Sequence, residues 1–292
     1  MAQLSRRLPQ NTEGPFFVDA TCIDCDACRQ IAPRSFARSE ESELSYVYAQ
    51  PASGSEQTRA LMALVACPTS SIGTVNGGDA RTAAALFPEL ITNGIYYCGY
   101  TSEKSFGASS YLVLQPGGNV MVDSPRAASP LLRRIESLGG VRLMLLSHRD
   151  DVADHQKFHD RFGCERVLHK LEVGRGTASV ERQLAITGPL EIEPGWLAIP
   201  VPGHTRGSVA YLYRDEYLFT GDHLWWSPNV NALHASRRVC WYDWDLQIAS
   251  MERLLDYRFR WVLPGHGRRF QAESAAEMRS ELKALVRRMR NA

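Results

Sequence analysis

Three cysteines lie close together near the start of the chain, and a fourth follows further along. Cys22, Cys25 and Cys28 are spaced C-x2-C-x2-C, and Cys67 is followed directly by Pro68. Thiolates at this spacing are typical of a loop that covers one face of an iron–sulfur cube, with a distant Cys-Pro supplying the fourth corner. The four side chains therefore predict a bound iron–sulfur cluster.

The stretch around these cysteines resembles a single-cluster bacterial-type ferredoxin. FFVDA before Cys22 is typical of a short strand, and SEQTRALMALVA before Cys67 predicts an amphipathic helix with Leu61, Leu64 and Val65 facing inward. The resemblance extends over roughly residues 10 to 80 and implies a 4Fe-4S cluster as cofactor, with these ligands: Cys22, Cys25, Cys28 and Cys67. A cluster with three irons stays open if one cysteine is not used. A disulfide framework suits small secreted domains, and a zinc ribbon would need two paired C-x2-C knuckles, so both are less favoured.

The rest of the chain is long enough for a second domain. Of the 292 residues, 44% are hydrophobic and 22% are charged, and the net charge is +1. We therefore expect neither a general nucleic-acid surface nor a membrane surface. No apolar run approaches the ~20 residues of a spanning helix, and the N-terminus lacks the apolar stretch of a signal peptide, so we expect a cytoplasmic protein. The remaining cysteines are expected to be reduced bystanders: Cys98, Cys164 and Cys240.

Hydrophobic periodicity lapses in the segment GTVNGGDART, which predicts a domain boundary. We place a ferredoxin-like domain at residues 1-85 and a second domain at residues 86-292. The second part alternates predicted strands, such as VRLMLLS and WLAIPVPG, with predicted helices, such as PLLRRIESL and SMERLLDYR. Loops that follow strands are where catalytic groups collect, because the sheet positions them and the loop exposes them.

Histidines and aspartates follow four of these predicted strands. VRLMLLS leads into HRDDVADH, WLAIPVPG into HTRGS, YLFTG into DHL, and WVLPG into HG. Neutral imidazoles and carboxylates hold zinc, iron or manganese, and one carboxylate can bridge two cations. A lone Gly-His is more often a turn, and Asp222 alone could cap a helix. The four strand ends together favour a metal site.

The order of these residues resembles that of the metallo-β-lactamase superfamily, and PGHTRGS and FTGDHL are similar to its glyoxalase II-like members. The resemblance extends over about residues 95 to 270 and implies an α+β fold, a four-layer αββα sandwich with one or two divalent metals (Zn, Fe or Mn) at one edge of the sheets. The implied metal ligands are His148, Asp154, His155, His204, Asp222 and His266. Asp123 is expected to support the metal loop through hydrogen bonds.

The chain departs from the family pattern at one place. Where the family has H-x-H-x-D-H, this chain has two extra residues and no second histidine. We expect Asp150, in preference to Asp151, to replace the missing imidazole, as an acidic ligand does in the resembling flavodiiron branch. An added carboxylate makes the site harder and leans away from an all-nitrogen zinc site. The alternative is that both residues only cap the helix that follows.

Three functions compete. The favoured one is a metal-dependent hydrolase of a small ester or thioester, in which two cations share Asp222 and activate water while Asp154 orients the nucleophile. The second is an iron-dependent oxidoreductase of persulfide dioxygenase or flavodiiron type, with His148, His204 and Asp222 as a facial site. Its need for electrons would account for the fused cluster. The third is an iron–sulfur sensor or electron-transfer protein without hydrolase activity.

The segment after Asp222, LWWSPNVNALHASRRVCWYDWD, is rich in tryptophan and arginine. It contains Trp225, Trp226, Trp241 and Trp244, with Arg237 and Arg238 between them. One interpretation is a pocket wall for a small-molecule substrate with an apolar and an anionic part. The other is an interface to the ferredoxin domain or to a second subunit in an oligomer. Both interpretations stay open. A redox partner for the cluster is a separate expectation.

Overall fold

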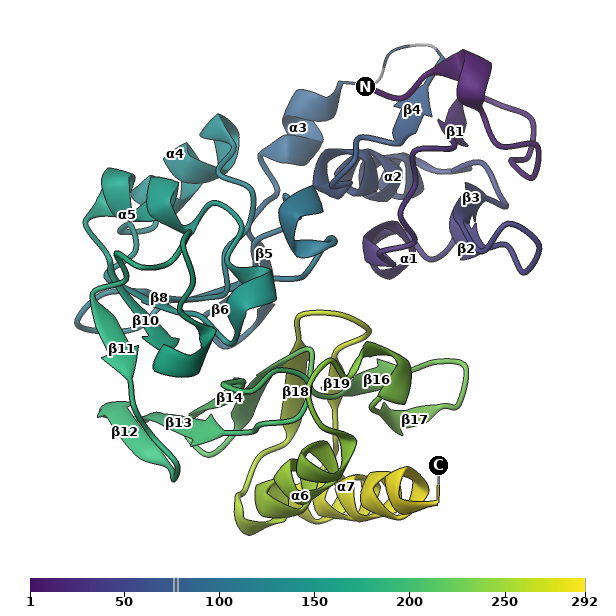
Figure 1. The fold of residues 1–292 in the computed structure, drawn as a ribbon. Coiled ribbons are helices and arrows are strands. Elements are labelled where there is room, and N and C mark those ends of the chain that lie inside the picture. The colour runs from purple at the N-terminus through teal and green to yellow at the C-terminus, as the bar shows by residue number, and fades with distance from the viewer. Residues whose placement is uncertain (76, 78, 292) are drawn as a thin grey trace. The chain divides into compact units, whose positions relative to one another are not determined.

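The computed structural model describes residues 1–75, 77 and 79–291. The chain divides into two compact units, one of Met1–Arg142 with Ala153–Gly163 and one of Leu143–Val152 with Cys164–Ala292. Both contain helices and strands, which confirms the α+β class (Figure 1). The boundary near residue 85 stays a prediction, and positions 76 and 78 of the segment that contains it lie outside the described residues. None of the described helices combines the length and the apolar character needed to cross a membrane.

The N-terminal part of the first unit is built from short elements. β1 (Phe16–Val18) pairs antiparallel with β4 (Ile72–Thr74), and β2 (Phe36–Arg38) pairs antiparallel with β3 (Ser45–Val47). The helices of this part are η1 (Leu4–Arg6), α1 (Ala27–Ile31), α2 (Gly54–Ala66) and α3 (Ala80–Ala84). The strand predicted before Cys22 and the helix predicted before Cys67 are both confirmed.

The buried face of α2 is not the predicted one. Its fully buried residues are Ala60, Met62, Ala63 and Ala66, whereas Leu61, Leu64 and Val65 are only partly buried. The prediction was wrong because it gave the inward face to the largest apolar side chains. Alanines on that face let α2 lie close to its two helical neighbours, α1 and α3.

The remainder of the first unit is an antiparallel sheet with helices beside it. Its strands, paired in sequence order, are β5 (Glu89–Thr92), β6 (Ile95–Tyr97), β7 (Tyr111–Val113) and β8 (Val120–Val122). η2 (Glu103–Ser105) lies in the connection between β6 and β7. α4 (Ser129–Ser137) and α5 (His155–Phe162) lie together beside this sheet (Figure 1), and Arg161 of α5 pairs with Glu136 of α4 at 2.7 Å.

The second unit contains a six-stranded sheet in the order β12, β13, β14, β15, β18, β19. The β15–β18 pair is parallel and the other neighbours are antiparallel. The bounds are β12 (Leu190–Glu193), β13 (Trp196–Pro200), β14 (Val209–Tyr213), β15 (Tyr217–Gly221), β18 (Trp261–Pro264) and β19 (Phe270–Gln271). α6 (Trp244–Arg253) and α7 (Ala275–Arg290) lie side by side and share a hydrophobic core with this sheet (Figure 1).

The same unit has three parallel strands in the order β9, β10, β11. Their bounds are β9 (Leu143–Leu145), β10 (Glu165–His169) and β11 (Arg182–Leu184). The remaining elements are η3 (Arg149–Asp151), η4 (Lys170–Glu172), β16 (Trp225–Ser227), β17 (Ala232–His234), η5 (Arg237–Val239) and η6 (Leu254–Asp256). Strands are confirmed within VRLMLLS, WLAIPVPG, YLFTG and WVLPG. The helix predicted at SMERLLDYR begins earlier, at Trp244, because the Asp243 carboxylate accepts a hydrogen bond from the Leu246 N–H at 2.9 Å.

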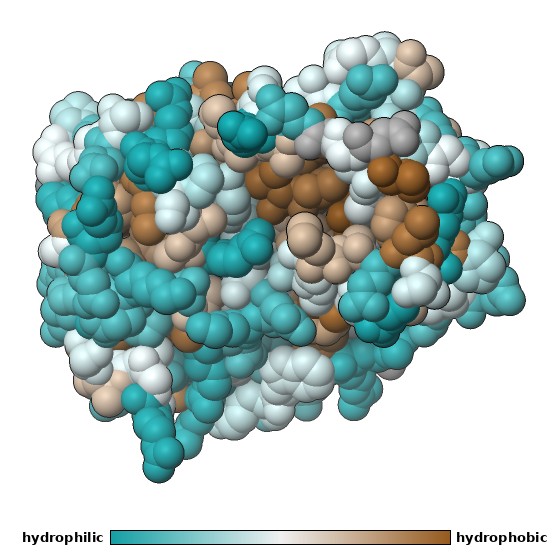
Figure 2. All heavy atoms as spheres, turned by 90° about the horizontal axis from the view of Figure 1, so that it is seen from above, coloured by the Kyte–Doolittle hydropathy of each residue, from teal (hydrophilic) through white to brown (hydrophobic). Residues whose placement is uncertain are grey.

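The surface is mainly hydrophilic on the face seen from above Figure 1, and hydrophobic side chains gather in the middle of that face (Figure 2). In the second unit, large exposed apolar side chains follow one another along the chain at Val239, Trp241 and Tyr242. Trp241 is the most exposed of the three, at 66%. This short stretch belongs to the tryptophan-rich segment, which is exposed at Val230 as well.

Trp196 on β13 anchors the six-stranded sheet. It is fully buried and stacks on Tyr213 and Phe219, with ring centroids 4.5 and 5.7 Å away. We expect Trp196→Ala to lower the free energy of unfolding by about 3–5 kcal/mol, because it removes a buried ring and leaves a cavity. Urea titration followed by circular dichroism measures this, with exposed Trp241→Ala as the control, which should change stability by less than ~0.5 kcal/mol. Equal effects of the two substitutions would contradict this account of the core.

Candidate functional site

His148 follows β9 and leads into η3. Its backbone is extended, with φ −164° and ψ 179°, and its side chain is buried. The Ser147 hydroxyl hydrogen-bonds His148 Nδ1 at 2.9 Å, and among the described residues Nε2 has no hydrogen-bond partner. Burial lowers the pKa of this imidazole, so it stays neutral, which is the form that binds metals.

His204 lies in the loop after β13 and is held in a matching way. Its Nδ1 donates to the Val239 carbonyl at 2.5 Å, and its own carbonyl accepts from the Trp241 N–H at 2.9 Å. A proton on Nδ1 leaves the lone pair on Nε2, which is also buried and without a hydrogen-bond partner in the described part of the chain. The two imidazoles meet edge to face at 4.8 Å.

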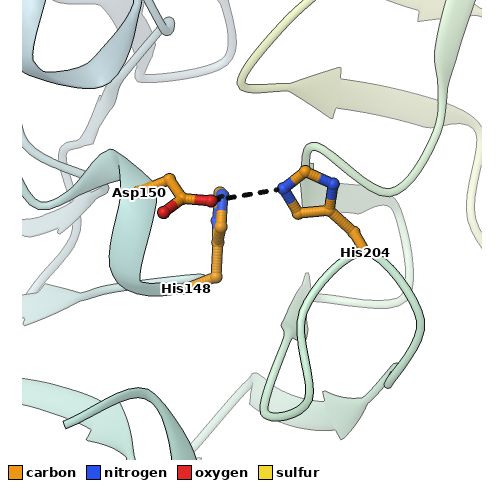
Figure 3. A group of neighbouring side chains, drawn as sticks. All are labelled: His148, Asp150 and His204. Atoms are coloured by element: carbon orange, nitrogen blue, oxygen red, sulfur yellow. Dashed lines mark ion pairs between the residues drawn. The ribbon is translucent and has the colours of Figure 1, made fainter. Parts of the chain in front are cut away.

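Two carboxylates face these nitrogens. Asp150 Oδ2 lies 3.7 Å from His148 Nε2 and 3.6 Å from His204 Nε2, as Figure 3 shows. Asp222, directly after β15, places Oδ2 at 3.7 and 3.8 Å from the same two atoms. Donors bound to one ion at about 2.1 Å lie roughly 3–4 Å from one another. The ligand atoms of His148, Asp150 and His204 all lie within 4.8 Å of one another, so the spacing of these three fits one cation.

The electrostatics of the carboxylates agree with this geometry. The nearby imidazoles of His204 and His148 lower the pKa of Asp150. Burial works against ionisation of Asp222, but His266 and the two imidazoles hold its pKa below the usual range. Both groups are carboxylate anions near neutral pH, so the site joins the nitrogen donors of two imidazoles to two anionic oxygen donors.

A second group shares Asp222. The ligand atoms of His148, Asp151 and Asp222 all lie within 4.8 Å of one another, and His266 Nδ1 lies 2.7 Å from Asp222 Oδ1. Gly265 lies beside them, and its N–H donates to the Gly221 carbonyl at 2.8 Å. That hydrogen bond ties the ends of β15 and β18 together, so the loops that carry Asp222 and His266 start from one place.

Two predicted ligands belong to the other compact unit. Asp154 there pairs with Lys104 at 3.1 Å and Lys157 at 3.2 Å and accepts from the Ala127 N–H at 3.0 Å. His155 is the buried first residue of α5. Neither belongs to the two ligand groups found among the described residues, and their metal-binding roles stay predictions. Asp150 lies inside η3, so it does not cap α5, whose N-cap is Asp154.

Glu172 positions the site, and no sequence motif marked it. Its fully buried carboxylate accepts from the Arg149 backbone N–H at 3.1 Å, from Arg149 Nε at 2.7 Å and from the Gly207 N–H at 2.6 Å. One side chain thus joins the turn after His148 to the loop after His204. Its place in the sequence, 23 residues after Arg149 and 35 before Gly207, gave no signal of this role.

His223 is a second residue that sequence reasoning passed over. It is buried, and neither ring nitrogen has a hydrogen-bond partner among the described residues. Burial and the neighbouring imidazoles lower its pKa to about 3, so it is neutral. Its carbonyl accepts from Gln247 Nε2 at 3.0 Å. A histidine directly after Asp222 in FTGDHL was the available signal.

Some tryptophans of the tryptophan-rich segment pack in the hydrophobic core, and one lies near the candidate metal site. Trp226 stacks on Phe270 at 4.2 Å, and Trp226 and Trp244 pack against the core of the second unit. Trp241 instead lies 6.1 Å from the His204 ring and is exposed. Cys240 donates through its Sγ to the Gly203 carbonyl at 3.1 Å, which fixes this stretch to the His204 loop.

The four N-terminal cysteines surround a single cavity in the first unit. It is lined by Cys22, Cys25, Cys28 and Cys67, with Val18, Ile23 and Ile72 among the apolar residues. Burial raises the pKa of Cys25 to about 12 and also raises that of Cys28. Buried thiols become thiolates only when a cation such as iron binds them, so the donor set fits an iron–sulfur cluster.

Comparison with known proteins agrees with both parts. Residues 18–74 match the family model of the 4Fe-4S single cluster domain of Ferredoxin I. No curated protein matches the chain. Among solved structures, the chain is similar to BLEG-1 B3 metallo-beta-lactamase, with 20% identity, a TM-score of 0.51, and coverage of 65% of this chain and 99% of that one.

Two further solved structures are similar to about two thirds of the chain. VMB-1 has 15% identity and a TM-score of 0.50, covering 67% of this chain and 95% of that one. TMB-1 has 15% identity and a TM-score of 0.51, covering 67% of this chain and 96% of that one. At these identities the likeness concerns the fold. The chain therefore carries an N-terminal single-cluster 4Fe-4S ferredoxin domain, and the remainder has the metallo-β-lactamase fold.

Proposed function

We propose that this protein is a metal-dependent hydrolase of a small ester or thioester. The observation that carries the proposal is the pair of buried imidazoles, His148 and His204, whose Nε2 atoms have no hydrogen-bond partner among the described residues and face Asp150 and Asp222 at 3.6 to 3.8 Å. Leaving a buried polar atom unsatisfied costs about 1–3 kcal/mol. Two such atoms at one place, beside two carboxylates, are accounted for if the group holds a divalent cation.

The chain's own residues supply the rest of the chemistry. A cation held by His148, Asp150, His204 and Asp222 would polarise a carbonyl and lower the pKa of water. Asp150 has 45% of its side chain exposed, so water can reach this side of the site from solvent. Exposed Trp241 beside His204 offers an apolar face for the acyl group.

A second candidate is an iron-dependent oxidoreductase, and one set of contacts favours it. In the first unit, Thr101 donates from N and Oγ1 to the Ala66 carbonyl at 3.2 and 2.8 Å, next to the cluster ligand Cys67. Further along the same loop, Lys104 pairs with Asp154. These contacts run from the cluster to the segment that follows His148 in sequence. A carboxylate-rich ligand set also suits iron or manganese.

Anaerobic purification separates the two candidates. Metal and acid-labile sulfide are quantified, and hydrolysis of p-nitrophenyl acetate and of an acetyl thioester is measured before and after removal of the metal. The hydrolase proposal expects turnover that is lost on chelation and restored by a divalent cation. Iron at the His/Asp site with no hydrolysis of either compound would contradict the hydrolase proposal and favour the oxidoreductase.

We expect His204→Ala to lower hydrolysis about 100-fold or more, because it removes a metal ligand. The visible absorption of the cluster should be unchanged, since the four cysteines belong to the other compact unit. His159→Ala, which lies on α5 outside both ligand groups, serves as the control. Loss of the cluster together with activity would contradict the independence of the two centres.

Gly107 tests the loop beside the cluster. A Cβ there would lie 2.5 Å from Cys25 Cβ and 2.8 Å from its Sγ, and the glycine has φ +86°. We expect Gly107→Ala to lower acid-labile sulfide per chain, because the cysteine would have to move. Gly117→Ala is a matched control, with φ +87° and nothing within 4 Å. If both variants keep a full cluster, this contact does not constrain it.

A further inference from the structure

We propose that Asp151, and not Asp154, is the carboxylate that holds a second divalent cation together with Asp222. This inference deepens the proposed metal chemistry and rests on it. Asp151 is 1% exposed, and its carboxylate lies in one group with Asp222 and His148, all ligand atoms within 4.8 Å. The family pattern H-x-H-x-D-H would instead give this role to Asp154.

The backbone explains how Asp151 reaches the site. His148 is the N-cap of η3, and Asp151 is the last residue of that 3-10 helix. Side chains three residues apart in a 3-10 helix eclipse one another. The turn therefore brings Asp151 onto the same side as His148. Asp150, one residue earlier in the chain, faces His204.

Charge calls for a cation at this place. Two carboxylates at short range and out of solvent raise each other's free energy unless a positive charge lies between them. His148 lies in the same group as these two carboxylates. Its Nε2 is buried and has no hydrogen-bond partner among the described residues.

Gly265 leaves the room that such a site needs. A Cβ at this residue would lie 2.5 Å from Asp151 Oδ2 and 2.7 Å from Asp222 Oδ1. Its φ lies outside the left-handed region, so its backbone conformation does not itself require glycine. Because Gly265 has no side chain, there is free space beside the two carboxylate oxygens, which come from different loops.

Asp154 is already neutralised. Its two oxygens contact the ammonium groups of Lys104 and Lys157 and the Ala127 N–H. A carboxylate with two cationic partners has less charge to offer a metal ion. Asp154, which the family pattern selects, therefore belongs to a salt-bridge network. Asp151, which the pattern does not select, belongs to the ligand group.

Zinc binding tests the assignment without reference to turnover. The full chain with its cluster is depleted of other metals and dialysed against Zn²⁺, and zinc per chain is measured beside acid-labile sulfide. We expect two zinc ions in the unaltered chain, one in Asp151→Asn and two in Asp154→Asn. Gly265→Ala should also lose one, with Gly188→Ala, whose Cβ meets nothing within 4 Å, as its control.

The outcomes separate the two proposals. One zinc in the unaltered chain would overturn the second site and leave the proposed function standing, whereas no zinc would count against both. Loss of one zinc in Asp154→Asn with none lost in Asp151→Asn would restore the family pattern. If Asp151→Asn does not fold, Gly265→Ala decides, because binding of two zinc ions there would contradict the geometry.

A different observation carries a second inference, about the cluster. We infer that Arg29 and Ser45 form a relay that raises the reduction potential of the cluster through Cys28. Arg29 Nη1 donates to Ser45 Oγ at 2.6 Å, so the Ser45 hydroxyl is left to donate to the Cys28 sulfur, with which it is hydrogen-bonded. Both Ser45 and Cys28 line the cluster cavity.

The sign follows from charge. Reduction adds negative charge to the cluster and its thiolates, and a hydrogen bond to sulfur stabilises the reduced state more than the oxidised one. Arg29 is 8% exposed and is fixed by Asp24 and Asp26 at 2.6 and 2.5 Å. A guanidinium held in this way polarises the hydroxyl and strengthens the bond that it donates.

Redox titration of the full chain, followed by cluster absorption, tests the relay. We expect Ser45→Ala to lower the midpoint potential and Ser45→Thr, which keeps the hydroxyl, to retain it. Ser39→Ala removes a buried hydroxyl that accepts from the Ser42 N–H outside the cavity, and should leave the potential unchanged. An unshifted potential in Ser45→Ala would overturn the inference. If that variant loses its cluster, Arg29→Lys replaces it and should shift the potential in the same direction.

Discussion

The buried carboxylate of Glu172 is the interaction on which the geometry of the metal centre depends. It binds the turn after His148 through Arg149 and the loop after His204 through Gly207. Hydrogen bonds to a charged group are each worth about 1.5–3 kcal/mol, and a buried carboxylate without them would be strongly unfavourable. The two histidines therefore face each other because one anion holds both of their loops, and neither loop can shift without leaving that anion uncompensated.

Carboxylates outnumber imidazoles among the ligand groups that lie between the two loops held by Glu172. Asp150, Asp151 and Asp222 all point toward His148 or His204, while burial keeps His148 and His223 neutral. A group of this composition carries excess negative charge and draws in a hard divalent cation. The same composition weakens the Lewis acidity of that cation, which is why hydrolysis and iron chemistry stay in competition for this site.

Much of this could be predicted from sequence, for reasons that are local. The cysteine spacing fixes a cluster loop, and apolar strands followed by His or Asp mark the ends where ligands gather. What the sequence did not reveal depends on distant partners or on local helix geometry. Glu172 meets Arg149 and Gly207 only after the strands have paired, and Asp151 reaches the ligands because η3 is a 3-10 turn.

The predictions of the inward face of α2 and of the first residue of α6 were wrong for a related reason. Periodicity assigns a helix face by hydrophobicity, but the close neighbours of α2 select alanine there, and tertiary packing overrides the pattern. For α6, the side-chain cap from Asp243 starts the helix at Trp244, ahead of the segment predicted from periodicity. Sequence patterns thus identify which elements exist, whereas caps and neighbours decide where they begin and which face they bury.

The remaining question is why one chain carries both centres, and the loop between β6 and β7 limits the answers. It touches the cluster through Gly107 and Cys25, and it also holds Asp154 through Lys104. Gly107 leaves no room for a side chain beside Cys25, and Lys104 of the same loop pairs with Asp154. Within the first unit, one loop therefore links the cavity of the four cysteines to the segment that carries Asp154.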